Sequence, residues 1–292
     1  MLLSRFFDFD RTCGGRCSSV WTALLRGSFN DMFGDNMPLI DMMMALVSMT
    51  LKNREGFDGN QHSDVYHKLY DYVEYCAGTA NLSKELIRSG FWGASLDKLY
   101  LEEDHDMLSL KGIKLFITTL LASRFGALHW FGTCCSSFVV LCQSVSLRSA
   151  ANSFLGDESR DFVCCGNCMS EVSALLFFLS LIVKCCPVLE QPMSSTMPLT
   201  PSWHAILMFF QCVRTPTYMG QYGGFSQKPL QIWHKPSTFE GLARSRPSFA
   251  LQTLASRDHE GHFTGKKDLL VISGAYTAEF GSAVASIFST LG

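Results

Sequence analysis

Residues 72–97 read YVEYCAGTANLSKELIRSGFWGASLD and contain the pattern that decides the fold. The apolar residues 72–76 predict a short strand, which ends where small residues follow. Residues 81–89 predict a helix, because their apolar side chains share one helical face and Gly90 follows them. Residues 91–96 predict a second strand. The stretch is therefore a strand–helix–strand unit.

The same alternation continues toward the C-terminus. Helices are predicted at residues 110–123, 170–184 and 203–213, and strands at residues 127–131, 187–189, 217–222 and 230–233. Alternation of this kind is typical of parallel βαβ units. The sequence therefore predicts an α/β fold, a Rossmann-like doubly wound and mostly parallel sheet with helices on both faces. Ligands of such sheets bind at the carboxyl ends of the strands, so chemical groups are expected just after each strand.

The chain of 292 residues divides into two predicted regions. Residues 1–65 form an N-terminal extension, partly helical at residues 37–51 and followed by a polar linker. Residues 66–292 are long enough for one domain with a sizeable core. The apolar fraction of 47% and the charged fraction of 17% favour a folded protein over a disordered one.

Charge and cysteine placement limit the classes of function. The net charge of −2 does not indicate a strong nucleic-acid binder, so any grip on phosphates must come from a local positive surface. The 12 cysteines include adjacent pairs that bridge poorly, which favours free thiols in a reduced, intracellular compartment. The longest apolar run, residues 174–183, is too short to span a bilayer and predicts a buried helix. We expect no membrane partner.

The turn after the first strand predicts a cofactor site. Ala77 and Gly78 allow a ligand to approach the backbone closely, and the following helix offers free N–H groups. Asp97 lies 19 residues beyond Gly78 and ends the second strand, a spacing that suits a carboxylate bound to two ribose hydroxyls. The GxGxxG pattern is missing, which argues against nicotinamide or flavin. A simple turn before a helix remains the alternative.

These residues carry a resemblance to a known family. EYCAGTA at 74–80 and SLD at 95–97 resemble the first two motifs of class I S-adenosylmethionine-dependent methyltransferases. The resemblance implies that the cofactor S-adenosyl-L-methionine is held by Glu74, Cys76, Ala77, Gly78, Thr79 and Asp97. Asp106, before the next helix, resembles the acid that approaches the adenine amino group. A helix-capping role for Asp106 remains open.

The third strand ends in a second motif. HWFGTCCSSF at 129–138 resembles the Gly-x-Pro-Cys-Ser-Ser loop of the DNA cytosine-5 methyltransferase family, and this alignment puts the nucleophile at Cys135. Such a thiolate adds to C6 of the pyrimidine, and C5 then accepts the methyl group. LEQP at 189–192 resembles the family's Glu-Asn-Val, which implies that Glu190 holds a proton against the ring N3. Ser136 and Ser137 are the implied substrate contacts beside Cys135.

Two later stretches extend the resemblance over residues 66–292. YGGFSQKP at 222–229 resembles the family's Tyr-Gly-x-x-Gln-x-Arg-x-Arg, which makes Gln227 and Lys228 further substrate contacts, and residues 280–284 resemble its closing motif. Three departures stand out. Cys134 replaces the proline before the nucleophile, so the loop loses a fixed φ angle. The paired arginines of the family motif are absent. Lys228 stands near their place, but an ammonium group cannot make the two parallel hydrogen bonds of a guanidinium group. The segment before the closing motif is also short for a DNA-recognition domain.

The sequence thus predicts an S-adenosylmethionine-dependent methyltransferase that acts on C5 of cytosine in DNA, or less favourably RNA, through a Cys135 adduct. One alternative is a catalytically weak cofactor-binding relative, acting as a nucleic-acid-associated or interaction protein. Another is a methyltransferase for a different substrate, with a structural Cys135. The expected location is nuclear or cytoplasmic. No metal is expected, although Cys165 and Cys168 with Cys13 and Cys17 leave a weak zinc alternative.

Overall fold

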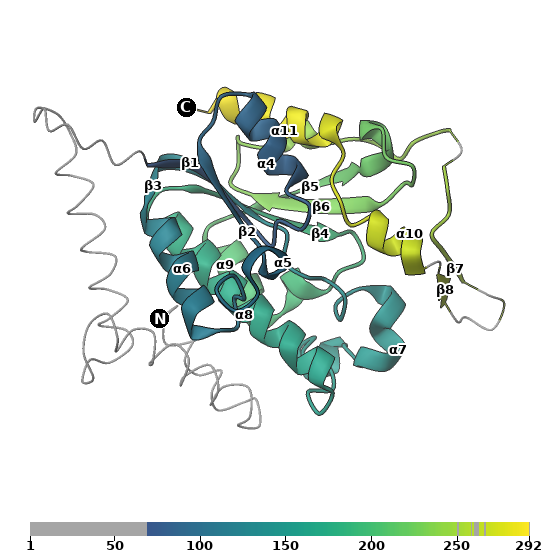
Figure 1. Cartoon of the computed structure of the whole chain (residues 1–292). Coiled ribbons are helices and arrows are strands. Elements are labelled where there is room, and N and C mark those ends of the chain that lie inside the picture. Colours follow the sequence, from purple (N-terminus) through teal and green to yellow (C-terminus); the bar gives the residue numbers. More distant parts are fainter. Residues whose placement is uncertain (1–68, 250, 258, 260–262, 266, 292) are drawn as a thin grey trace, which may run out of the picture.

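The computed structural model describes residues 69–249, 251–257, 259, 263–265 and 267–291, which form an α/β fold around a six-stranded sheet (Figure 1). The strand order is β2-β1-β3-β4-β6-β5. Its strands are β1 (Tyr70–Tyr75), β2 (Gly93–Leu96), β3 (Ser123–Phe131), β4 (Cys186–Pro192), β5 (Val213–Tyr218) and β6 (Pro229–His234). The predicted N-terminal extension, with its helix at residues 37–51 and the Cys13–Cys17 pair, lies outside the described residues.

The sheet is mixed but mostly parallel. β1 pairs in parallel with β2 and with β3, and β3 pairs in parallel with β4. β6 is antiparallel to both of its neighbours, β4 and β5. A separate two-stranded sheet pairs β7 (Ala255–Arg257) with β8 (Phe263–Gly265). The predicted α/β class and mostly parallel sheet are confirmed, but the order is not strictly that of a Rossmann sheet.

The reversed strand has a simple cause. β5 and β6 are joined by residues 219–228, which contain only the 3-10 helix η4 (Met219–Tyr222). Parallel neighbours need a long crossover, whereas a short connection lets the chain turn back beside itself. The helix predicted at residues 203–213 and the strand predicted at 217–222 are both present, but their bounds differ from the prediction. Helix α9 (Pro201–Phe209) is shorter, and residues 219–222 are not a strand.

Helices cover both faces of the sheet (Figure 1). One face packs against α4 (Asn81–Arg88) and α11 (Ala278–Ser289). The other packs against α6 (Leu110–Leu121), α8 (Asp161–Ile182) and α9. The remaining described α-helices are the short α5 (Lys98–Leu101), α7 (Gln143–Ser146) and α10 (Lys267–Ile272).

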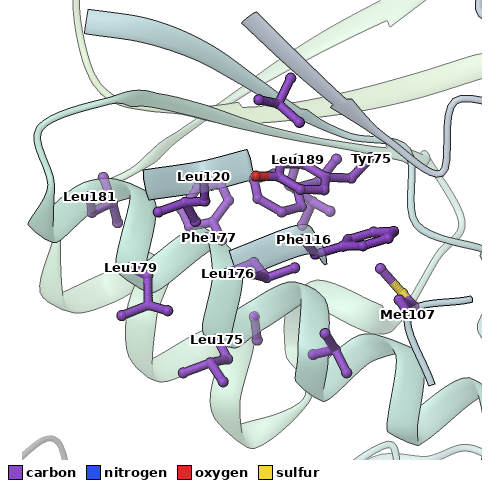
Figure 2. Packing of buried hydrophobic residues seen from close by; sticks show 14 of the residues in the cluster. Tyr75, Met107, Phe116, Leu120, Leu175, Leu176, Phe177, Leu179, Leu181 and Leu189 are labelled. Atoms are coloured by element: carbon purple, nitrogen blue, oxygen red, sulfur yellow. The ribbon is translucent and has the colours of Figure 1, made fainter. Parts of the chain in front are cut away.

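Side-chain alternation along β1 supplies both cores. Tyr72 is buried with α4 and α11, whereas Val73 and Tyr75 are buried on the opposite face. Figure 2 shows the second core, where Tyr75 and Leu189 of the sheet lie close to Phe116 and Phe177 of the helices. The Tyr75 and Phe116 ring centroids are 5.5 Å apart. Because β1 is buried on both of its faces, its position in the sheet is fixed. The position of the loop that follows its carboxyl end is fixed with it.

Helix α8 is the main support of this second core. It is longer than the predicted residues 170–184, and by length and composition it is the one described helix that could cross a membrane. Yet 61% of its apolar window is buried inside the fold. Phe177 on α8 is fully buried, with its ring centroid 5.2 Å from that of Trp203 on α9. A helix that is apolar all round fits a buried position.

The core role of α8 can be tested with a matched pair of phenylalanines. Phe177→Ala should lower the free energy of unfolding by about 3–5 kcal/mol, because it leaves a cavity in a packed core. Phe162 lies on the first turn of the same helix and is 40% exposed, so Phe162→Ala should cost less than about 1 kcal/mol. Urea unfolding measures both. Equal costs would contradict the assignment of α8 to the core.

Candidate active site at the carboxyl ends of the strands

The strand order makes the connections that follow β1 and its neighbour β3 leave the sheet in different directions. From β1 the chain crosses to β2 on one side, and from β2 it returns to β3 on the other side of β1. Ligands of open α/β sheets bind outside the carboxyl ends of the strands at such a switch point. The segments that follow β1, β2 and β3 here are residues 76–80, Asp97 and residues 132–138. They contain most of the predicted site residues.

Asp97 ties the ends of β1 and β2 together. Its Oδ2 accepts a 2.8 Å hydrogen bond from the Gly78 N–H, and its Oδ1 accepts one of 2.9 Å from the Leu99 N–H at the start of α5. A carboxylate has about four lone-pair positions, so each oxygen keeps one for a ligand. Gly78 has a φ of +53°, and no atom lies within 4 Å of the place where its Cβ would be. The predicted ribose acid is thus half-buried and faces an open loop.

The rest of the loop after β1 is built from small or neutral groups. Cys76 and Ala80 both adopt left-handed backbone conformations, Ala77 is buried and Thr79 is exposed. Ala80 begins α4 without a side-chain cap. Burial, and then the charge of Asp97, raises the pKa of Cys76 far above its ordinary value. The Cys76 thiol therefore stays neutral and lines the loop as an apolar group.

Glu74 lies beneath this loop as a buried carboxyl. Its Oε2 accepts hydrogen bonds of 2.9 Å and 2.5 Å from the N–H and hydroxyl of Ser83 in α4. Its Oε1 has no hydrogen-bond partner among the described residues. Burial raises the pKa of Glu74 to about 7, against the lowering effect of the Ser83 hydrogen bonds. Glu74 therefore exchanges its proton near neutral pH.

Asp106 has a local structural role that the sequence left open. Its Oδ1 accepts a 2.9 Å hydrogen bond from the Leu108 N–H, which forms a turn before α6. The neighbouring Met107 is buried, and its sulfur lies 4.0 Å from the Cys76 thiol. Asp106 is thus close to the loop after β1. Its second carboxylate oxygen keeps the predicted contact with an adenine amino group open.

Three anchors hold the loop after β3. The Gly132 N–H donates to the Tyr75 carbonyl at 3.1 Å, and the Thr133 hydroxyl donates to Ser173 of α8 at 2.8 Å. Gln191 of β4 donates from Nε2 to the Thr133 carbonyl at 2.8 Å. These bonds join the loop to β1, α8 and β4. They compensate in part for the missing proline at Cys134.

Cys135, Glu190 and Lys228 converge at this loop. The pKa of Cys135 is raised to about 12, mainly by burial and then by the nearby Glu190 and Cys134, whereas Lys228 lowers it. Glu190 is 7% exposed, and its Oε2 accepts a 2.8 Å hydrogen bond from the Tyr276 hydroxyl. Its Oε1 has no hydrogen-bond partner in the described part of the chain. The predicted nucleophile and acid are thus brought together from different strands.

The remaining predicted substrate contacts differ in their surroundings. Cys134 and Ser136 are exposed, with the thiol 3.4 Å from the hydroxyl. Gln227 and Lys228 are half-buried. Gln227 Oε1 accepts a 3.0 Å hydrogen bond from Arg246, and Lys228 Nζ donates to the Gly274 carbonyl at 3.3 Å. Ser137 is buried, unlike Ser136, and is held by a residue that the sequence did not indicate.

That residue is Arg148, whose side chain is almost fully buried. Its Nε donates to the Ser137 carbonyl and its Nη2 to the Ser137 hydroxyl, both at 2.8 Å. Its guanidinium carbon lies 3.6 Å from the Phe138 ring centroid, and Nη1 donates to Asn167 of α8 at 2.7 Å. Gly166 of α8 leaves room for the Ser137 side chain, because a Cβ on residue 166 would lie 2.3 Å from the Ser137 hydroxyl oxygen. Ser137 therefore supports the loop.

Sequence reasoning missed Arg148, Gln191 and Tyr276. Gln191 gave a usable signal, because a polar residue inside a buried strand needs a partner. Arg148 and Tyr276 belong to no local pattern. Cys165 and Cys168 lie on α8, and no group of three or more potential metal ligands occurs among the described residues. The Cys13–Cys17 half of the zinc alternative lies outside them.

Comparisons with known proteins add no relative: no family model, curated protein or solved structure matches the chain.

The protonation of Cys135 gives the first test of the site. With a pKa of about 12 the group is a neutral thiol at pH 7, so alkylation by iodoacetamide should be slow and rise about tenfold per pH unit. Glu190→Gln removes a charge that raises the pKa and should speed labelling, whereas Lys228→Met should slow it. Peptide mass spectrometry measures the rates. A rate that is constant between pH 7 and 9 would contradict the assigned protonation state.

Glu74 gives a second test through stability. Its pKa is about 7 in the folded protein and 4.5 for an ordinary glutamate, so the folded protein binds more protons between these values. Stability should therefore fall as the pH rises through this window, by about 3 kcal/mol for a fully effective group. Glu74→Gln should lose this dependence while keeping the Ser83 bonds. Urea unfolding at pH 5 and pH 8 measures it, and parallel curves for both proteins would refute it.

Proposed function

We propose that this chain is an S-adenosylmethionine-dependent methyltransferase with a Rossmann-like, doubly wound sheet, and that it methylates C5 of cytosine in nucleic acid. One observation carries the proposal: a thiol, a buried carboxyl and an ammonium group lie near one another at the loop after β3, where the last two both contact Tyr276. These are Cys135, Glu190 and Lys228. They follow β3, lie in β4 and precede β6, and they are the residues that the motif resemblance selects.

The residues after β1 and β2 fit the cofactor. Asp97 keeps a lone pair on each carboxylate oxygen for the ribose hydroxyls, and the space beside Gly78 is open. Glu74 supplies an unpartnered carboxyl oxygen near the methionine portion, and Cys76, Ala77 and Thr79 complete the loop. Asp106 would face the adenine amino group. When bound, the cofactor supplies an electrophilic methyl group.

Cys135 and Glu190 have different roles in the proposed reaction of the pyrimidine. The Cys135 thiol gives its proton to solvent water, its sulfur forms a bond to C6, and the C5–C6 π electrons move onto C5. A proton on Glu190 Oε1 would hydrogen-bond N3 and stabilise the charge that develops on the ring. After C5 takes the methyl group, water accepts the C5 proton, and elimination of the Cys135 sulfur restores the C5–C6 double bond. Glu190 is 7% exposed, whereas Cys135 is half-buried and stays within reach of water.

Nucleic acid is the proposed substrate, with DNA favoured over RNA. Ser136 is exposed beside Cys135 in the chain, and Ser137 holds their loop in place. Lys228 is near enough to lower the pKa of Cys135, and Gln227 precedes Lys228 in the chain. Arg246 adds a positive charge beside Gln227. We propose a nuclear or cytoplasmic location, without a membrane or metal partner.

One observation favours a second candidate, a cofactor-binding relative with weak or no catalysis. The pKa of about 12 leaves Cys135 almost wholly protonated at neutral pH, and Glu190 disfavours the thiolate. Turnover requires the bound substrate to change this electrostatic balance. A nucleic-acid-associated or interaction protein would need no such change.

Covalent trapping separates the two candidates. Incubation with the cofactor and a 5-fluorocytosine oligonucleotide should give a protein–DNA adduct, because fluorine cannot leave as a cation and blocks release. Cys135→Ser should abolish the adduct. Cys134→Ser should retain it, and Cys134→Pro should preserve or raise its yield, because proline fixes the loop. Intact-protein mass spectrometry detects the product.

Calorimetry provides the matched control. Cys135→Ser should keep full cofactor affinity, whereas Asp97→Ala should lose about 1–3 kcal/mol of it. Cofactor binding without any adduct would favour the weak relative. Loss of the adduct in Cys134→Ser alone would move the nucleophile by one position. Folded wild-type protein that binds no cofactor would remove the methyltransferase proposal.

A further inference from the structure

Tyr276 reaches the site from the segment between α10 and α11. It is 9% exposed, and its ring centroid lies 6.0 Å from that of Trp130 and 5.3 Å from that of Phe280. Its hydroxyl receives a 3.0 Å hydrogen bond from Trp130 Nε1 and donates one of 2.8 Å to Glu190 Oε2. The phenol thus lies between a buried indole of β3 and the buried carboxyl of β4.

The direction of the first bond is fixed by the chemistry of its donor. An indole N–H can only donate, so the Tyr276 oxygen must accept from Trp130. The phenol has one proton, and it points to Glu190 Oε2. Oε2 therefore acts as the acceptor in this bond. The free position of the carboxyl group is Oε1, the oxygen without a partner among the described residues.

The charged groups nearby keep the phenol in its donating form. Burial raises the pKa of Tyr276 well above its ordinary value, and the charges of Glu190 and Glu74 add to this effect. Lys228 is the cation on this side, with its Nζ 5.8 Å from the Tyr276 ring centroid and bonded to the Gly274 carbonyl. Tyr276 is thus a neutral donor throughout the working pH range.

We propose that Tyr276 is a positioning residue: it reserves Oε2 of Glu190 as an acceptor, so that Oε1 presents the proton to the substrate. This inference rests on the proposed function, in which that proton bonds N3 of the pyrimidine. It assigns a role to a side chain outside every motif of the sequence. Without Tyr276 the Glu190 proton could occupy either oxygen, and the carboxyl could rotate away from the ring.

The test measures adduct formation with the 5-fluorocytosine oligonucleotide and cofactor in a single turnover. Tyr276→Phe keeps the ring but removes the hydroxyl, and should slow the maximum rate by about 10- to 100-fold, the cost of a misplaced group. The oligonucleotide concentration at half-maximal rate should not change. Tyr222→Phe is the matched control, because Tyr222 is a buried phenol that also packs on Phe280 but donates to the Leu242 carbonyl. It should keep the wild-type rate.

A second substitution distinguishes positioning from general damage. In a Glu190→Ala background no carboxyl remains to be positioned, so adding Tyr276→Phe should slow the reaction no further. If Tyr276→Phe does not fold, Trp130→Phe decides, because it leaves the phenol free to accept from Glu190 and should also slow the adduct. Wild-type rates in the decisive variant, or equal slowing with and without Glu190, would overturn the inference. Failure of the proposed function looks different: the wild-type protein itself would form no adduct, and the inference would fall with it.

Discussion

The parallel pairing of β1 with both β2 and β3 is the constraint on which the rest of the structure depends. It brings the carboxyl ends of three strands to one edge of the sheet, with loops that leave in different directions. The Gly78–Asp97 hydrogen bond and the Gly132–Tyr75 hydrogen bond both result from this pairing. If β1 were the outermost strand of the sheet, it would have only one neighbouring strand, and these loops would not face one another.

Burial at this edge has a consistent electrostatic effect. Glu74, Cys76, Cys135 and Tyr276 all have raised pKa values, and in each case burial is the largest cause. A buried acid group prefers its neutral form, because the low-polarity interior solvates charge poorly. The site is therefore rich in neutral groups that release protons reluctantly. Groups of this kind suit hydrogen bonding, and under the proposed function attack by Cys135 would depend on what binds beside it.

The loop after β3 illustrates how a missing rigid residue can be replaced by contacts from elsewhere. Cys134 stands where the resembling family has proline, yet Arg148, Gln191 and Ser173 hold the residues on either side of it. Burial lowers the pKa of Arg148 to about 10, which still leaves the guanidinium charged at neutral pH, and the group donates to oxygens from several segments. Tertiary hydrogen bonds thus supply restraint that the local backbone lacks.

The sequence by itself determined the strand–helix–strand unit, the burial of α8 and the chain positions of Asp97, Cys135 and Glu190 after or near strand ends. Those features depend on residues close together in the chain, whose spacing reports directly on helix or strand geometry. The tertiary structure decided the direction of β6, the burial of Ser137 against Arg148 and the bond from Tyr276 to Glu190. The last pair is 86 residues apart in the chain. Such contacts depend on how whole elements pack, and no local periodicity encodes which distant side chain will meet a buried polar atom.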